Sequence, residues 1–185
     1  MPGLGVGWSP EEFDAVGVPM SERGARFDET LDALDQMWTE DVASFDGKFV
    51  QVPATRVALK PVRRPPIYLA AFAPASMRRV ARRGDGWLPA VVLPAMTDLD
   101  AAVNQPFAAL RAMTVEEGRD PAALDMILRI YPNVRTDSVV DDVVSMIKRV
   151  EAETEVRHVL VDLMYQADDI DTLLKLVGEI LSVRP

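Results

Sequence analysis

The second half of the sequence alternates short apolar runs with segments of helical spacing, and this alternation constrains the fold more than any other feature. The predicted strands span 67–72, 87–93, 126–131 and 158–163, and a predicted helix follows each of them. Parallel strands need a crossover element between them, so the pattern predicts an α/β fold with a parallel sheet. Periodicity alone leaves a closed barrel and an open sheet as alternatives.

The apolar runs predict strands that are covered on both faces. Ile67–Leu69 and Val159–Val161 contain no charged residue, which is typical of strands in a buried parallel sheet. Helical spacing is clearest in 74–83, 139–150 and 170–181. A further helix from Thr97 must break or kink at Pro106, because proline lacks the amide that the helix needs.

The first 66 residues have a different organisation. Ser9 and Glu12 have the spacing of a capping box, with Pro10 at the first helical position. A second helix is expected to begin near Ser21. Residues 42–66 are expected to form a surface excursion, with a hairpin that turns at Asp46-Gly47 and is followed by several prolines.

Composition excludes several functional classes. The 185 residues fit one domain, here predicted as 1–185, and a net charge of −9 argues against nucleic-acid binding. The sequence has no cysteine and a single histidine, His158, so we expect no metal site of the thiolate or multi-histidine type. No apolar run reaches the ~18 residues that span a bilayer and no secretion signal is apparent, so we expect a cytoplasmic protein without a membrane partner.

The most informative strand-to-helix turn is 70–76. Ligands of parallel α/β folds bind beyond the carboxyl ends of the strands, and small side chains here let a ligand approach the backbone. The free amides of the following helix are suited to hold a phosphate. The alternative interpretation is a turn that is small only so that helix and sheet pack closely.

Other candidates have simpler structural explanations. The Gly84–Trp87 segment fits a tight helix-to-strand turn. The arginine cluster at 63, 64, 78, 79, 82 and 83 fits a solvated helix face. Asp162 lies near the carboxyl end of the last predicted strand, where a functional acid belongs, although no partner can be named for it. The adjacent Asp168 and Asp169 fit a helix N-cap and first-turn acid cluster.

The sequence resembles the luciferase-like monooxygenases. The resemblance rests on Leu4–Trp8, Phe45–Gly47, Pro65–Ile67 and Gly84–Trp87, in this order, with Gly118–Pro121 frequent in the deazaflavin-using branch. It implies an enzyme, a flavin- or 5-deazaflavin-dependent monooxygenase or oxidoreductase, that takes a small-molecule substrate. The implied fold is a (β/α)8 barrel, and the implied cofactor is the deazaflavin coenzyme F-420 or FMN.

Carried over by position, the resemblance implies which residues contact the cofactor phosphate, although no catalytic residue can be named. The implied cofactor-binding residues are Gly7, Trp8, Ala71, Phe72, Ala73, Ala75 and Ser76. Many relatives have glycine at positions 72 and 73, so the Phe72 ring is expected to compete for space with the cofactor.

The resemblance begins only in the middle of the family's barrel. We therefore expect a partial barrel that lacks the N-terminal half and covers its exposed interior by self-association into a homo-oligomer. The alternative to a truncated enzyme, possibly inactive, is a non-catalytic half-barrel module that is stabilised by self-association.

Overall fold

The computed structural model describes residues 1–183. Its contacts divide the chain into two compact units, Met1–Ile67 and Tyr68–Pro185, and each unit is described by itself. The prediction of one domain over 1–185 stays a prediction, and its last two residues lie outside the described part.

The first unit contains three helical elements after a two-residue strand, β1 (Gly3–Leu4). They are α1 (Pro10–Ala15), a 3-10 turn at Met20–Glu22, and α2 (Arg23–Thr39). Ser9 Oγ accepts a hydrogen bond from the Glu12 amide at 3.3 Å, so the predicted N-cap is confirmed. The Ser9 hydroxyl also donates a hydrogen bond to the Glu11 carboxylate at 2.9 Å. The second bond of a capping box, from the Ser9 amide to the Glu12 carboxylate, is not formed among residues 1–183.

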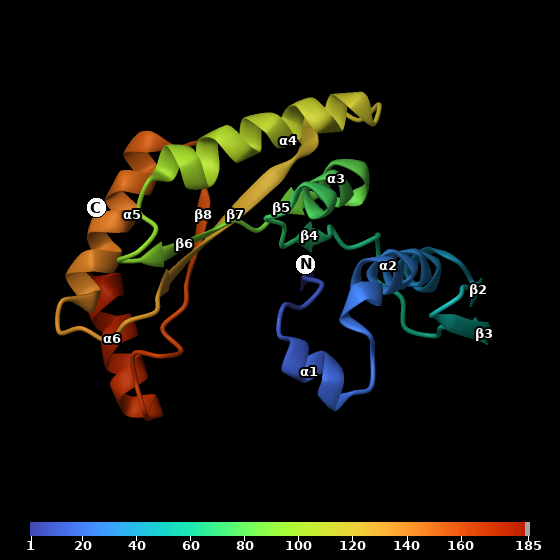
Figure 1. The fold of residues 1–185 in the computed structure, drawn as a ribbon, viewed down its shortest axis with the longest axis horizontal. Coiled ribbons are helices and arrows are strands. Elements are labelled where there is room, and N and C mark those ends of the chain that lie inside the picture. Colours follow the sequence, from blue (N-terminus) through green and yellow to red (C-terminus); the bar gives the residue numbers. More distant parts are fainter. Residues whose placement is uncertain (184–185) are drawn as a thin grey trace. The chain divides into compact units, whose positions relative to one another are not determined.

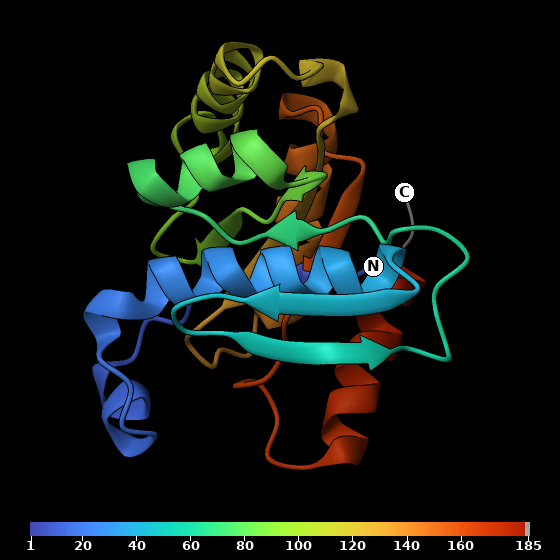
Figure 2. The ribbon, with the colours of Figure 1, turned by 90° about the vertical axis from the view of Figure 1, so that its right-hand side faces the viewer.

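The predicted hairpin is confirmed in the first unit. Strand β2 (Val42–Asp46) pairs with β3 (Gln51–Arg56) in antiparallel register, and both run beside α2 (Figure 2). Glu29 of α2 binds the turn, because its carboxylate accepts hydrogen bonds from the Lys48, Phe49 and Val50 amides at 3.1, 2.6 and 2.9 Å. A Cβ on Gly47 would lie 2.3 Å from Glu29 Oε2, which explains the glycine.

The second unit is built on a parallel sheet (Figure 1). Strands β4 (Tyr68–Leu69) and β5 (Gly86–Trp87) pair in parallel, and β5 pairs with the start of β7 (Asp125–Pro132). Strand β6 (Ala90–Leu93) continues β5 along the same edge of β7, and β8 (His158–Val161) lies on the other edge. The predicted strand at 87–93 is thus interrupted at Leu88-Pro89.

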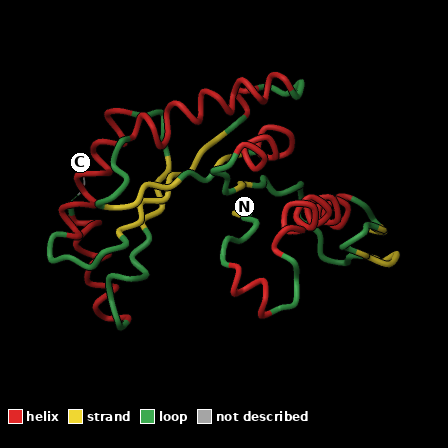
Figure 3. The backbone as a smooth tube through the Cα atoms, in the orientation of Figure 1, coloured by secondary structure: helices red, strands yellow, loops and turns green. Residues whose placement is uncertain are grey.

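Helices alternate with these strands as predicted (Figure 3). They are α3 (Pro74–Arg83), α4 (Gln105–Glu116), α5 (Val139–Glu153) and α6 (Ile170–Ser182). A π-helical segment at Asp100–Asn104 precedes α4, and Pro106 lies in the first turn of α4. The predicted break is confirmed, since Pro106 lacks the amide that would continue the regular bonding.

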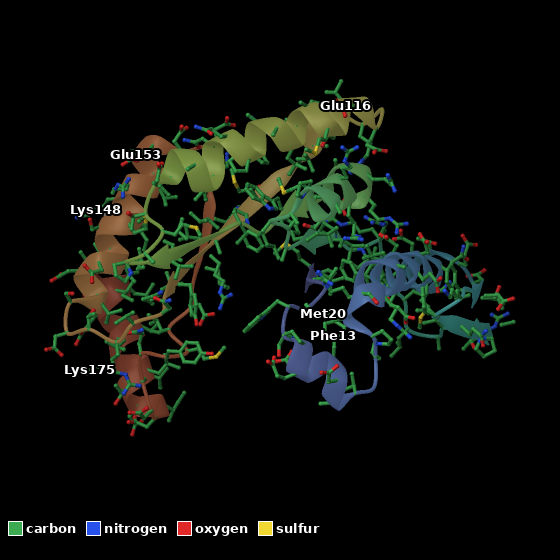
Figure 4. The ribbon with its side chains drawn as sticks, viewed as in Figure 1. Phe13, Met20, Glu116, Lys148, Glu153 and Lys175 are labelled. Atoms are coloured by element: carbon green, nitrogen blue, oxygen red, sulfur yellow. The ribbon has the colours of Figure 1, made fainter. Side chains whose placement is uncertain are left out.

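The side chains of β7 alternate strictly between two faces of the sheet. Met126, Leu128 and Ile130 are buried on one face, whereas Ile127, Arg129 and Tyr131 are half-buried on the other. Helices α4 and α5 lie on one side of the strands, and Lys148 of α5 points away from them (Figure 4).

The last strand and helix differ from the prediction. We expected β8 to be covered on both faces, but Val159 and Leu160 are 38% and 54% exposed. In α6 no residue is buried, and Ile170, Leu174 and Leu181 are each at least 60% exposed. Continuous apolar sequence predicted the strand correctly, but it cannot reveal whether a neighbouring element covers it.

Among residues 1–183, no helix combines the length and apolar character that crossing a membrane requires.

Candidate functional site

The predicted turn connects β4 to α3 and is closed by its own serine. Ser76 Oγ accepts hydrogen bonds from the Phe72 and Ala73 amides at 3.2 and 3.1 Å, and it donates to the Ala73 carbonyl at 2.8 Å. The amides of Phe72 and Ala73 are therefore engaged within the turn. The amides of Phe72 and Ala73 are thus removed from the set of predicted phosphate contacts.

Two amides of the first turn of α3 remain available to a ligand. The first four amides of an α-helix have no intrahelical acceptor, and Pro74 has no amide to offer. The N-cap residue is Ala73, whose methyl group cannot accept a hydrogen bond from the Ala75 or Ser76 amide. Ala73 and Ala75 are exposed, so an anion can reach these two amides from solvent.

Ala71 and Trp87 hold the 70–76 turn against the buried core. Ala71 is 2% exposed, and its carbonyl accepts a hydrogen bond from Trp87 Nε1 at 2.9 Å. The Trp87 ring is buried and stacks on Phe107, with ring centroids 6.2 Å apart. Trp87 thus holds the turn in place instead of lining an open pocket. The Gly84–Trp87 motif is a structural feature of this site.

Gly86 and Tyr68 complete this support. A Cβ on Gly86 would lie 2.3 Å from the Tyr68 ring, so only glycine lets β4 and β5 approach this closely. The Tyr68 hydroxyl donates to Asp125 Oδ2 at 2.6 Å. Burial, together with the hydrogen bond and charge of Asp125, raises the pKa of Tyr68 to about 12.

Arg119 fixes the other end of α3. Its guanidinium donates to the carbonyls of Val80, Ala81 and Gly84 at 3.3, 2.7 and 2.8 Å. The Val80 carbonyl also accepts from the Gly84 amide, whereas the last carbonyls of a helix generally lack an intrahelical donor. Gly118 supplies the positive φ of 72° that turns the chain after α4. The Gly118–Pro121 motif therefore positions α3, and with it the amides of the candidate site.

The remaining predicted residues differ in their environment. The Phe72 side chain is 72% exposed, and competition between its ring and the cofactor stays a prediction. Gly7 adopts a φ of 80° with the Phe13 ring against it, and Trp8 is 82% exposed. Both belong to the first unit, so their predicted place beside the turn stays a prediction, as does cofactor binding by all seven residues.

For Arg78 and Arg82 of the arginine cluster, the structure supports the interpretation as a solvated helix face. Arg78 is exposed, and Arg82 pairs with Glu117 at 3.4 Å. His158 is exposed at the start of β8. Within residues 1–183, no group of three or more His, Asp or Glu side chains is arranged to hold a metal ion.

The acids after β8 have clear partners. Asp162, for which the sequence suggested no partner, pairs with Arg129 of β7, with Arg129 Nε 2.9 Å from Asp162 Oδ2. Asp169 is the predicted N-cap of α6 and accepts from the Thr172 amide at 2.8 Å. Asp168 instead forms a two-point ion pair with Arg135, at 2.7 and 2.9 Å.

Comparisons with known proteins agree on the family. The family model of the luciferase-like monooxygenases matches residues 2–170. The uncharacterized protein Rv0940c of Mycobacterium tuberculosis is 40% identical over 88 residues, which are 46% of this chain and 30% of that protein. An F420-dependent glucose-6-phosphate dehydrogenase of Kineococcus radiotolerans is 34% identical over 89 residues, which are 46% of this chain and 26% of that enzyme.

A solved structure agrees on the fold. The monooxygenase RslO1 of Streptomyces bottropensis superimposes with a TM-score of 0.73 at 18% identity, over 97% of this chain and 66% of that one. For the two curated relatives, Rv0940c and the F420-dependent dehydrogenase, the segment matched by this chain is less than a third of the relative's own length.

Proposed function

Because the chain belongs to the luciferase-like monooxygenase family, we propose that it acts in an oxidoreductase that uses a reduced flavin or 5-deazaflavin on a small-molecule substrate. We further propose that its parallel strands form part of a (β/α)8 barrel. The F420-dependent relative supports the deazaflavin coenzyme, and FMN is the alternative that shares its phosphate.

The observation that carries this proposal is the pair of available amides at the N-terminus of α3. A phosphate placed there receives hydrogen bonds from Ala75 and Ser76 and gains from the positive end of the helix dipole. The Ser76 hydroxyl holds the preceding backbone in place, and Trp87 and Arg119 fix the turn and the helix from either side. These residues therefore fit the phosphate of either cofactor.

The bound cofactor would supply the electron chemistry through its ring system. The described residues would contribute binding and orientation. Amides held rigidly by the surrounding hydrogen bonds need no reorganisation when the phosphate binds, and this preorganisation favours one position of the cofactor.

A second candidate function is a non-catalytic module that acts through self-association. The exposed apolar side chains of β8 and α6 favour it, because exposed apolar surface often marks interaction sites in proteins. Light scattering at micromolar concentration tests it, since a monomer that binds no hydrophobic dye would contradict self-association.

Titration of the purified chain with FMN and with the deazaflavin coenzyme tests the enzyme proposal, followed by fluorescence and by melting temperature. At a hundred times its dissociation constant, a ligand stabilises the folded state by about 2.7 kcal/mol. We expect this shift with one of the two cofactors.

The variant Ala75→Asp tests the site itself. A carboxylate in the first turn is favourable to the helix dipole, so the fold is kept, but the same charge repels a phosphate. Ala75→Asn has nearly the same shape without the charge and is the matched control. Equal cofactor affinity in both variants would place the phosphate elsewhere.

A further inference from the structure

A cluster of polar side chains lies at the carboxyl ends of β7 and β8, separate from the α3 turn. Arg129 and Tyr131 are two residues apart in β7 and so lie on the same face of that strand. Asp162 and Tyr165 follow the last residue of β8. We call these four residues the phenol–guanidinium cluster.

Contacts within the cluster hold the guanidinium over an aromatic ring. Arg129 Nε and Nη2 both donate to Asp162 Oδ2, and the other oxygen, Oδ1, accepts from the Met164 amide at 3.0 Å. The guanidinium carbon lies 4.4 Å from the centroid of the Tyr131 ring. The Tyr131 and Tyr165 rings are tilted by 56° with centroids 5.9 Å apart.

The cluster offers more hydrogen-bond donors than acceptors. Both oxygens of Asp162 are engaged, whereas Arg129 Nη1 has no acceptor among residues 1–183. The Tyr131 and Tyr165 rings are in contact, and a hydrogen bond between the two phenols would use only one of their two O–H groups. A guanidinium N–H and a phenol O–H therefore remain for a ligand.

The phenol of Tyr131 is a donor at neutral pH and not a base. Burial raises its pKa, the charges of Tyr165 and Asp162 raise it further, and Arg129 opposes them. Tyr131 therefore keeps its proton. Tyr165 is 55% exposed and presents its ring to solvent.

We infer that the phenol–guanidinium cluster binds the oxygen of a planar, conjugated ligand, either a carbonyl or a phenolate oxygen. The remaining donors of Arg129 and the tyrosine pair bind this oxygen, and the exposed Tyr165 ring contacts the conjugated plane. The inference rests on the proposed function, which it deepens by naming a substrate class for the carboxyl end of the sheet.

Binding of 4-nitrophenol tests this inference without cofactor or turnover, because the absorbance of the bound compound reports its ionisation. We expect saturable binding and a lower apparent pKa for bound than for free 4-nitrophenol, since the donors favour the phenolate. The matched ligand 4-nitroanisole has the same ring with a methylated oxygen, and we expect it to bind at least tenfold more weakly.

Two variants locate the site. Tyr131→Phe and Arg129→Gln are each expected to weaken binding about tenfold, which corresponds to about 1.4 kcal/mol. Arg111→Gln is the control, because Arg111 also forms a two-point ion pair, with Glu155, and lies 4.4 Å over the Phe107 ring. Circular dichroism establishes that each variant is folded.

Several results would overturn the inference. They are absence of 4-nitrophenol binding by the wild-type chain, equal binding of 4-nitroanisole, and equal effects of the Arg111 and Arg129 variants. The proposed function is tested separately by the flavin titrations. A chain that binds the cofactor but not 4-nitrophenol would refute only the inference, and the reverse result would refute only the phosphate site.

Discussion

Removing the Ser76 hydroxyl is expected to loosen the start of α3. The variant Ser76→Ala loses an acceptor for two amides, those of Phe72 and Ala73, and a donor to the Ala73 carbonyl. Neutral hydrogen bonds contribute about 0.5–1.5 kcal/mol each, but water replaces part of this in an exposed turn. Measured helix-cap substitutions cost about 1 kcal/mol, and we expect the same loss of unfolding free energy here.

Urea unfolding, followed by circular dichroism, measures this difference directly. A loss of about 1 kcal/mol corresponds to a fall in melting temperature of about 2–4 °C for a chain of this size. Ser145→Ala is the control, because Ser145 is an exposed residue within α5. If both variants unfold at the same urea concentration, the Ser76 hydroxyl does not stabilise the turn and the reasoning is refuted.

Three further substitutions test other parts of the structure. Gly86→Ala would place a Cβ 2.3 Å from the Tyr68 ring and should lower the unfolding free energy by about 1–3 kcal/mol, whereas Gly178→Ala, with open space around it, should raise it by about 0.5–1 kcal/mol. If both variants shift the melting temperature in the same direction, this reasoning is contradicted. Arg119→Ala should cost about 1.5–3 kcal/mol, because three helix-end carbonyls lose a charged donor, and Arg119→Lys should recover only part of it. Burial raises the pKa of Glu29, but three amide hydrogen bonds outweigh it and lower the pKa below its usual value of 4.5. The stabilisation by the Glu29 carboxylate is therefore fully present above pH 4.5, and it is lost as the pH falls through the pKa of the folded state. Urea unfolding at several pH values below 6 should therefore show a weaker acid dependence for Glu29→Gln than for the wild type.

The sequence predicted the order of strands and helices well because both signals are local. The period of apolar residues located α3, α5 and α6 within a few residues, and Pro106 marked the start of α4. It did not reveal the interruption at Leu88-Pro89. The exposure of β8 was also missed, since burial depends on elements that local sequence does not contain.

The candidate site was predicted as a segment but not in its bonding. The small residues at 70–76 indicated a ligand-accessible turn, yet nothing in them showed that Ser76 binds the amides of Phe72 and Ala73. The Arg129–Asp162 pair joins residues 33 positions apart, so spacing could not reveal it. A charged residue at an otherwise apolar position of β7 was the only available signal.

The most direct test of the phosphate site compares FMN with riboflavin, which has the same ring system without the phosphate. The deazaflavin coenzyme and its phosphate-free precursor provide a second pair. If the Ala75 and Ser76 amides hold the phosphate, the phosphorylated member of one pair should bind at least tenfold more tightly, and Ala75→Asp should abolish that preference. Equal affinities within both pairs would contradict it.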